Sequence, residues 1–140
     1  MEGSIKELSA YRYETAQENL QDARIMYDNG RYKNALNRAY YAIFHSVRAV
    51  IALDGFDSSK HSGVISHFNK NHVKNGDFNA DTSGIIRRAS MMREKSDYED
   101  FYEPDKEDTE GVIKEVTVFL STVKTFLDEK NGTICQRNSL

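Results

Sequence analysis

The sequence predicts an all-α fold, an up-and-down bundle of about five helices. Apolar residues recur at spacings of three and four along most of the chain, which is the period of one helix face. No stretch of useful length alternates between apolar and polar residues as a half-buried strand would. The chain has 140 residues, of which 39% are hydrophobic and one is proline. This is enough for one domain with its own core, which we place at residues 1–130, with a flexible tail at residues 131–140.

Turn residues separate the expected helices. Gly30 ends the first helix, Asp54 and Gly55 end the second, and Pro104 precedes the last. In chain order, the expected helices cover residues 5–28, 32–53, 59–74, 81–95 and 106–129. The buried side of the first helix is expected to consist of Leu8, Tyr11, Ala16, Leu20, Ala23 and Tyr27.

An acidic and aromatic connector, residues 97–103, lies before the last helix. We expect its Tyr98 and Phe101 to pack against the bundle, and its carboxylates to pair with Arg93 or Arg38. A carboxylate on Arg38 would weaken any phosphate-binding role of that residue, because the guanidinium would already be paired.

The composition excludes several classes of protein. The best apolar run is only about a dozen residues long and contains His45 and Arg48, which is too short to cross a bilayer. The start of the chain lacks the apolar segment of a signal peptide, and the single cysteine, Cys135, cannot form an internal disulfide. We therefore expect a cytoplasmic protein.

Charge is segregated along the chain although the net charge is only −3. Residues 31–95 carry eleven basic and five acidic side chains, whereas residues 96–129 carry three basic and eleven acidic ones. A basic middle can face a polyanion, since phosphate is attracted to local rather than total charge. Alternatively, the basic middle pairs internally with the acidic last helix.

The second helix carries three neighbouring stripes of side chains. The core stripe consists of Leu36, Tyr40, Ile43, Val47 and Val50. A stripe of small side chains, which lets another helix approach closely, consists of Ala35, Ala39, Ala42, Ser46 and Ala49. The polar stripe consists of Asn34, Arg38, Tyr41, His45 and Arg48.

Two members of the polar stripe lie two helical turns apart. Arg38 and His45 point the same way, roughly 10 Å apart along the axis at ~1.5 Å per residue, so their side chains can converge on one bound group. Alternatively, the stripe is only a boundary at which amphipathic side chains reach water.

The segment "NRAYYAIFH" resembles the signature of HEPN domains, an Arg followed after four to six residues by a His on a helix. Arg38 and His45 occupy these two positions with a gap of six residues. Around them, "AYYA", the pair Lys60 and His61, and "SDYED" are similar to the small stand-alone prokaryotic members of the family. The resemblance covers about residues 10–128.

This resemblance implies a helical bundle that forms a homodimer, in which the Arg and His of both chains meet at one cleft. Many members of the family are metal-independent ribonucleases that act as toxins or in phage defence, often beside a nucleotidyltransferase that neutralises them. One toxin branch has an Arg-x4-His-x-Tyr motif whose tyrosine is modified. Here Val47 stands two residues after His45, so this silencing is not carried over, and neither Tyr40 nor Tyr41 is an established substitute.

These residues suit cleavage of RNA, which carries its own nucleophile, the 2′-OH. His45 is the candidate general acid or base, and Arg38 the candidate group that holds the scissile phosphate. Candidate supporting residues are Asn34 and Tyr41, and candidate RNA- or nucleotide-binding residues are Arg48, Lys60 and His61. We expect no cofactor and no metal ion, although a metal site that uses His61 and His67 stays open.

A second hypothesis belongs to another class of function. In this alternative the chain is a non-catalytic nucleotide-binding or adaptor module that docks a nucleotidyltransferase partner. Both hypotheses use Arg38, and they differ at His45, which only the ribonuclease needs.

Overall fold

The second helix of the sequence forms the centre of the bundle. In the computed structural model, which describes residues 2–131, α2 (Tyr32–Ala52) packs against α1 (Glu2–Asp28) and against the three helices that follow it. Every member of the core stripe and of the small-residue stripe is buried, as predicted. The polar stripe is the part of α2 that stays partly or fully exposed.

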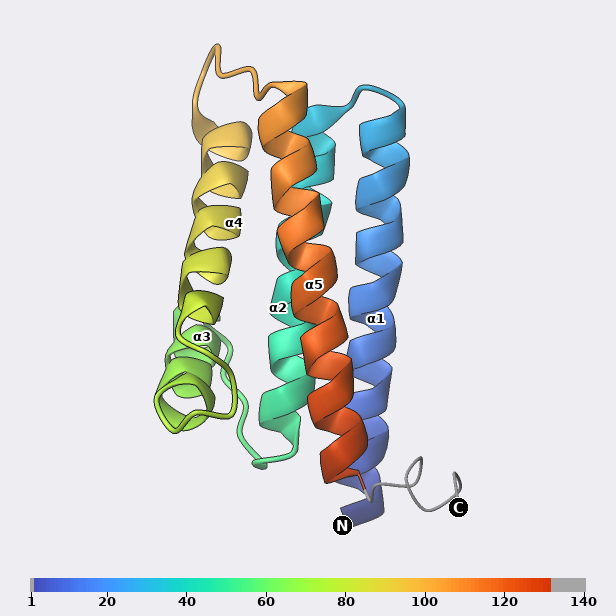
Figure 1. Ribbon diagram of the computed structural model, residues 1–140, viewed down its shortest axis with the longest axis vertical. Coiled ribbons are helices and arrows are strands. Elements are labelled where there is room, and N and C mark those ends of the chain that lie inside the picture. The colour runs from blue at the N-terminus through green and yellow to red at the C-terminus, as the bar shows by residue number, and fades with distance from the viewer. Residues whose placement is uncertain (1, 132–140) are drawn as a thin grey trace.

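The other elements surround α2. They are α3 (His61–Phe68), the π-helical turn η1 (Asn69–Val73), α4 (Asp81–Tyr98) and α5 (Lys106–Lys130). Figure 1 shows α1, α2 and α5 running along one another, with α4 beside them and α3 at the lower end of α4. Residues 2–131 contain no strand, and the predicted all-α, up-and-down bundle is confirmed.

The helix boundaries agree with the predicted ones to within a few residues, except in the third helix. Gly30 follows α1 with a positive φ of 74°, the left-handed conformation that commonly ends a helix. The predicted third helix becomes an α-helix only at His61 and changes to a π-helical turn after Phe68. Apart from Asn131, the predicted tail at residues 131–140 lies outside the described residues.

The buried face of α1 agrees only in part with the predicted one. Leu8 and Tyr11 are 43% and 67% exposed, so their predicted burial is wrong. The predicted burial of Ala16, Leu20 and Ala23 is confirmed, and the polar residues Ser9, Arg12 and Asn19 are buried beside them. These polar residues fit because they can bond to α2: the hydroxyl of Ser9, for example, donates to the carbonyl of Ala49 over 2.7 Å.

The connector before α5 is attached differently from the prediction. Tyr98 and Phe101 are exposed, Phe101 almost completely and with a positive φ of 64°, so the expectation that they pack is wrong. Tyr102 and Pro104 are the residues that turn inward. The predicted pairing of a connector carboxylate with Arg93 is confirmed, by Asp97 at 3.4 Å.

No helix within residues 2–131 is at once long enough and apolar enough to pass through a bilayer.

Candidate functional site

Arg38 is held in place by two amide side chains. Its Nη1 donates to Oδ1 of Asn19 on α1 over 2.8 Å, and its Nε and Nη2 donate to Oδ1 of Asn37 over 3.0 and 2.7 Å. Asn19 is buried, and its own Nδ2 donates to the carbonyl of Thr15, which fixes the orientation of the amide. The guanidinium also lies over the ring of Tyr41, 5.3 Å from its centroid.

The charge of Arg38 is not neutralised by these contacts, because amide oxygens carry only partial charge. Within residues 2–131, no carboxylate forms an ion pair with Arg38. The nearest carboxylate in the network is that of Asp97, which accepts from Nδ2 of Asn37 over 3.2 Å and so orients Asn37 rather than pairing with the guanidinium. Arg38 therefore keeps a full positive charge for an anionic group.

His45 lies two turns after Arg38 on the same edge of α2, among cations and aromatic rings. It is half-buried, with the ring centroids of Phe44 and Tyr41 at 5.7 and 6.2 Å. Burial lowers the pKa of His45, and the positive charges of Arg48 and Arg38 lower it further. Neither ring nitrogen forms a hydrogen bond with another described residue, so the neutral imidazole has both nitrogens available for proton transfer.

A buried arginine from α1 contributes to the same cluster. The side chain of Arg12 is only 9% exposed, and its Nη1 donates to the carbonyl of Arg48 over 3.3 Å. Asp57, from the loop after α2, pairs with Arg12 at 3.1 Å and with Arg48 at 3.5 Å. Burial raises the pKa of Asp57, but the Ser58 N–H and the two guanidinium groups outweigh it and lower the pKa overall. Arg48 is thus partly neutralised, unlike Arg38.

His61 joins the cluster from the start of α3. Its ring centroid lies 4.0 Å from that of Phe44, and its Nδ1 is hydrogen-bonded to the hydroxyl of Tyr40 at 3.2 Å. Burial lowers the pKa of His61, followed by the charges of Arg93 and Arg48. Lys60, directly before it, is exposed and has no ion pair within the described part of the chain.

The structure brings together five of the seven residues that the sequence singled out, and leaves Asn34 and the exposed Lys60 outside the group. The group that surrounds the exposed edge of α2 consists of Arg38, Tyr41, His45, Arg48 and His61. Asn34 instead lines a separate surface hollow with Glu103 and Pro104, and forms no hydrogen bond with Arg38.

Sequence reasoning missed the residues that hold this cluster in place: Arg12, Asn19, Asn37 and Asp57. Arg12 and Asn19 lie seven residues apart on α1, the same spacing that joins Arg38 to His45. A search of α1 for a polar stripe among small residues, as was made for α2, would have found both.

Internal charge pairing explains part of the basic middle of the chain. Arg88 of α4 pairs with Glu115 of α5 at 2.6 Å. Within residues 2–131, neither Arg38 nor Arg48 is paired with a carboxylate of α5. Internal pairing with the acidic last helix therefore accounts for Arg88, whereas Arg38 and Arg48 remain candidates for binding a polyanion.

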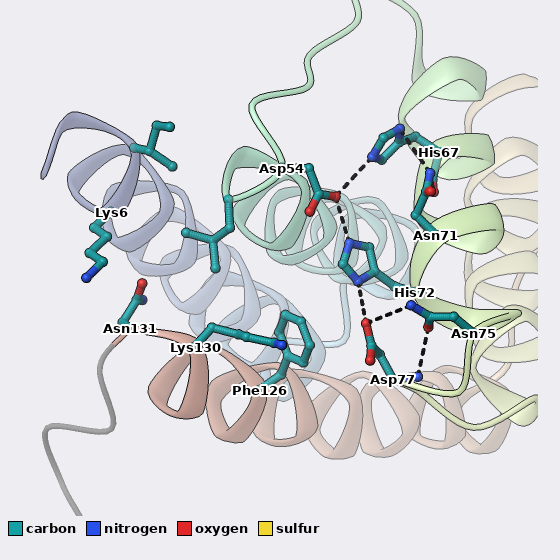
Figure 2. A pocket seen from close by; sticks show the side chains of 12 residues that line it. Lys6, Asp54, His67, Asn71, His72, Asn75, Asp77, Phe126, Lys130 and Asn131 are labelled. Carbon is teal, nitrogen blue, oxygen red and sulfur yellow. Dashed lines mark hydrogen bonds and ion pairs between the residues drawn. The ribbon is translucent and has the colours of Figure 1, made fainter. Parts of the chain in front are cut away.

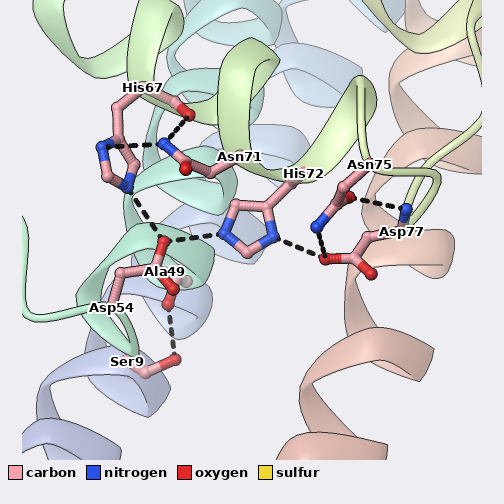
Figure 3. A network of polar contacts seen from close by, with 8 residues as sticks. All are labelled: Ser9, Ala49, Asp54, His67, Asn71, His72, Asn75 and Asp77. Atoms are coloured by element: carbon pink, nitrogen blue, oxygen red, sulfur yellow. Dashed lines mark hydrogen bonds and ion pairs between the residues drawn. The ribbon is translucent and has the colours of Figure 1, made fainter.

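A second histidine cluster lies at the end of the bundle where α2, α3 and α5 meet. Figure 2 shows it lining a cavity of about 880 Å³ beside Lys6 and Lys130. His72 is buried between two carboxylates, with Nε2 2.7 Å from Asp54 and Nδ1 2.9 Å from Asp77 (Figure 3).

The remaining groups of this second cluster are also paired with one another. Nε2 of His67 lies 3.0 Å from the same oxygen of Asp54, and Asn71 bonds to Nδ1 of His67 at 3.3 Å. The ring of His67 stacks on Phe56 with 4.0 Å between centroids. Because every imidazole nitrogen here has a partner, we interpret the cluster as structural.

The metal site left open by the sequence has no geometric support. His67 faces Asp54, whereas His61 faces Tyr40 and Phe44, so the two histidines belong to different clusters. Among the described residues, no three His, Cys, Asp or Glu side chains are arranged to hold a metal ion.

Comparisons with known proteins give one family. The family model described as "HEPN domain" matches residues 9–126. A protein of Methanocaldococcus jannaschii named "Putative toxin" is 37% identical over 116 residues, which cover 83% of this chain and 86% of that protein. A second protein of that organism with the same name is 30% identical over 118 residues, 84% of this chain and 80% of its own length. A "UPF0332 protein" of Thermotoga maritima is 33% identical over 114 residues, 81% of this chain and 86% of that protein.

Proposed function

The chain belongs to the HEPN domain family, and from this premise we propose that it is a metal-independent endoribonuclease that cleaves single-stranded RNA. Arg38 and His45 carry the chemistry in this proposal. The matching relatives named as toxins support a toxic ribonuclease rather than a housekeeping one.

One observation supports this function above the others: a charged Arg38 with no carboxylate lies on the same helix edge as a His45 with no hydrogen-bond partner among the described residues. Elsewhere in the described part of the bundle, Arg88 and His72 are each paired with a carboxylate. An unpaired cation beside an unpaired proton carrier is the arrangement that phosphodiester cleavage requires.

The reaction follows from the chemistry of RNA. A neutral imidazole takes the proton of the 2′-OH, and the 2′-oxygen attacks the adjacent phosphorus. The bond from phosphorus to the 5′-oxygen breaks, and the leaving oxygen takes a proton from an imidazolium. The products are a 2′,3′-cyclic phosphate and a 5′-hydroxyl. Arg38 binds the non-bridging oxygens, whose negative charge is greatest in the pentacovalent transition state.

A homodimer is part of this proposal. The reaction needs one proton acceptor and one proton donor. Of the two imidazoles in each cluster, His61 is bonded to the hydroxyl of Tyr40, which leaves His45 as the one without a hydrogen-bond partner among the described residues. A second copy that brings its own His45 to the same phosphate supplies the other group. Measurement of molar mass in solution by light scattering tests the dimer directly.

The biological role that fits is a toxin restrained by a partner protein in the cytoplasm, and the resemblance to toxin branches of the family suggests a nucleotidyltransferase as that partner. Induced expression of the chain alone should then stop growth, and co-expression of the nucleotidyltransferase should restore it.

The deciding experiment is cleavage of single-stranded RNA in the presence of EDTA. The wild type should cut, His45→Ala and Arg38→Ala should not, and an RNA with a 2′-deoxy nucleotide at the cut site should resist. The helical circular dichroism spectrum of both variants must match the wild type. If the wild type does not cut, and nucleotide binding depends on Arg38 but not on His45, the adaptor hypothesis replaces the ribonuclease.

A further inference from the structure

A second cavity, of about 660 Å³, lies between α3 and α4. It is within the size range of pockets that bind small ligands. Its apolar part consists of Ile65, Ile86 and Met91, and its polar part includes the hydroxyls of Ser62 and Ser90. An apolar surface with a few hydrogen-bonding groups at its edge suits an aromatic heterocycle that carries donors and acceptors on its own edge.

This cavity, which we term the α3–α4 pocket, shares walls with the candidate site. Tyr40, His61 and Arg93 line the pocket. His61 also contacts Phe44 and Tyr41 on the other side, with centroids 4.0 and 5.8 Å away. His61 therefore lies on the border between the candidate site and the pocket, so an RNA strand that extends from His45 over His61 would enter the pocket.

The charge of the pocket favours an RNA strand. Arg87 and Arg93 line it together with a single carboxylate, that of Glu94. Arg93 is also paired with Asp97, which does not line the pocket, so Arg87 is the lining cation without an ion pair among the described residues. The guanidinium of Arg93 lies over the buried ring of Tyr40, 4.7 Å from its centroid, so a planar cation backed by an aromatic ring forms one wall. Bases of single-stranded RNA commonly stack on such surfaces.

Arg93 also has an unused donor. One of its terminal nitrogens bonds to Asp97 at 3.4 Å, but its Nε is buried and has no acceptor among the described residues. A buried donor without an acceptor is unfavourable, because it has lost its hydrogen bonds to water and gained none in the protein. A ligand that brings a carbonyl or phosphate oxygen into the pocket would remove this cost after a small rotation of the side chain.

From these observations we propose that the α3–α4 pocket binds the nucleobase next to the scissile phosphate and thereby sets the sequence preference of cleavage. This inference rests on the proposed ribonuclease function. It assigns recognition to α3 and α4, whereas the proton transfers stay on α2.

The test fills the pocket without touching the chemistry. Ser90→Phe places a large ring in the cavity from α4. Ser66→Phe, the matched control, makes the same change at an exposed serine of α3 that does not line the pocket. The probes are the four 5′-ribonucleoside monophosphates, titrated into the full chain and followed by NMR, and a library of single-stranded RNAs whose cut sites are sequenced.

We expect at least one mononucleotide to shift the resonances of His61 and Ser90, and Ser90→Phe to weaken that binding by about tenfold or more. Ser90→Phe should still cut RNA but with an altered distribution of cut sites, while Ser66→Phe behaves as the wild type. An unchanged distribution with Ser90→Phe overturns the inference and leaves the ribonuclease standing. Mononucleotide binding that Ser90→Phe abolishes, in a chain that never cuts RNA, supports the pocket and overturns the proposed function.

Discussion

The two histidine clusters of this bundle use similar residues in opposite ways. Around His72, each imidazole nitrogen meets a carboxylate, and each carboxylate is bonded in turn. Around His45, the neighbours are three arginines and another histidine, all of which disfavour protonation, and no described residue bonds to the ring. The first arrangement holds α2, η1 and the following loop together. The second also joins α1 to α2, through Arg12 and Asn19, but it leaves the imidazole of His45 without a hydrogen-bond partner and Arg38 without a carboxylate among the described residues.

The largest effect expected from this comparison is on cleavage by His45→Gln. Loss of a proton-transfer group should lower the rate by about 10²–10⁴-fold. Because His45 bonds to no described residue, the unfolding free energy should change little. RNA cleavage and urea unfolding, measured on one preparation, check both statements. If His45→Gln lost stability as well as activity, His45 would have a structural role rather than a catalytic one.

His72→Ala should give the reverse result. Removing the ring leaves Asp54 and Asp77 without their shared hydrogen-bond partner, and the loss of a hydrogen bond to a charged group costs about 1.5–3 kcal/mol. The urea midpoint should fall accordingly, while the folded variant still cleaves RNA at temperatures below its transition. His67→Ala is the matched control, since His67 is more exposed and only one of its nitrogens faces a carboxylate, so its loss should cost less.

Asn19→Asp would give Arg38, which has no carboxylate partner among the described residues, an ion-pair partner. The Oδ1 of Asn19 lies 2.8 Å from Nη1 of Arg38, so the new carboxylate would form an ion pair there. The rate of RNA cleavage should fall by about tenfold. The reason is that the new carboxylate competes with the phosphate for the guanidinium of Arg38. Stability should change little, because the new ion pair is offset by the burial of a carboxylate and by loss of the hydrogen bond from Nδ2 of Asn19 to the carbonyl of Thr15. Gln17→Glu adds the same charge at an exposed position of α1 and should change neither quantity.

The smallest effect is on the pH dependence of stability. The pKa of His45 is lowered in the folded chain, chiefly by burial, so between that value and the ordinary 6.5 the unfolded state binds more protons. The unfolding free energy should therefore fall as the pH drops below about 6.5. His61 acts in the same direction. Urea midpoints at pH 7.5 and 5.5 should differ less in His45→Gln than in the wild type; an equal difference would contradict this origin.

The helices were predictable because hydrophobic periodicity and glycine stops are local signals. The core and small-residue stripes of α2 could be assigned from their spacing alone, and burial confirms them. The buried face of α1 was assigned only in part: Ala16, Leu20 and Ala23 are buried as predicted, but Ser9 and Arg12 look like surface residues and were missed. Both are inside because they donate to carbonyls of α2, Ser9 to Ala49 and Arg12 to Arg48. Hydropathy does not detect a polar side chain that finds its acceptor on a distant helix.

Part of the candidate site was predictable for the same reason. Arg38 and His45 share a stripe, which spacing along one helix predicts. The groups that position Arg38 and Arg12 come from elsewhere in the chain: Asn19 is nineteen residues from Arg38, and Asp57 is forty-five from Arg12. Only the packing of α1 on α2 brings them together. The exposed Tyr98 and Phe101 failed as core predictions because their connector is fixed by neighbours, Tyr102 and Pro104.

The close contact between α1 and the alanines of α2 has a consequence for how this protein tolerates change. Asn19 reaches Arg38 only because side chains such as Ala39 and Ala42 leave no bulk between the two backbones. A larger side chain at Ala39 or Ala42, in this α1–α2 contact, would displace the amide of Asn19 from the guanidinium of Arg38 before it unfolded the bundle. Libraries selected for folding alone would therefore accumulate inactive but well-folded sequences with enlarged side chains here, and selection for activity would return these positions to alanine.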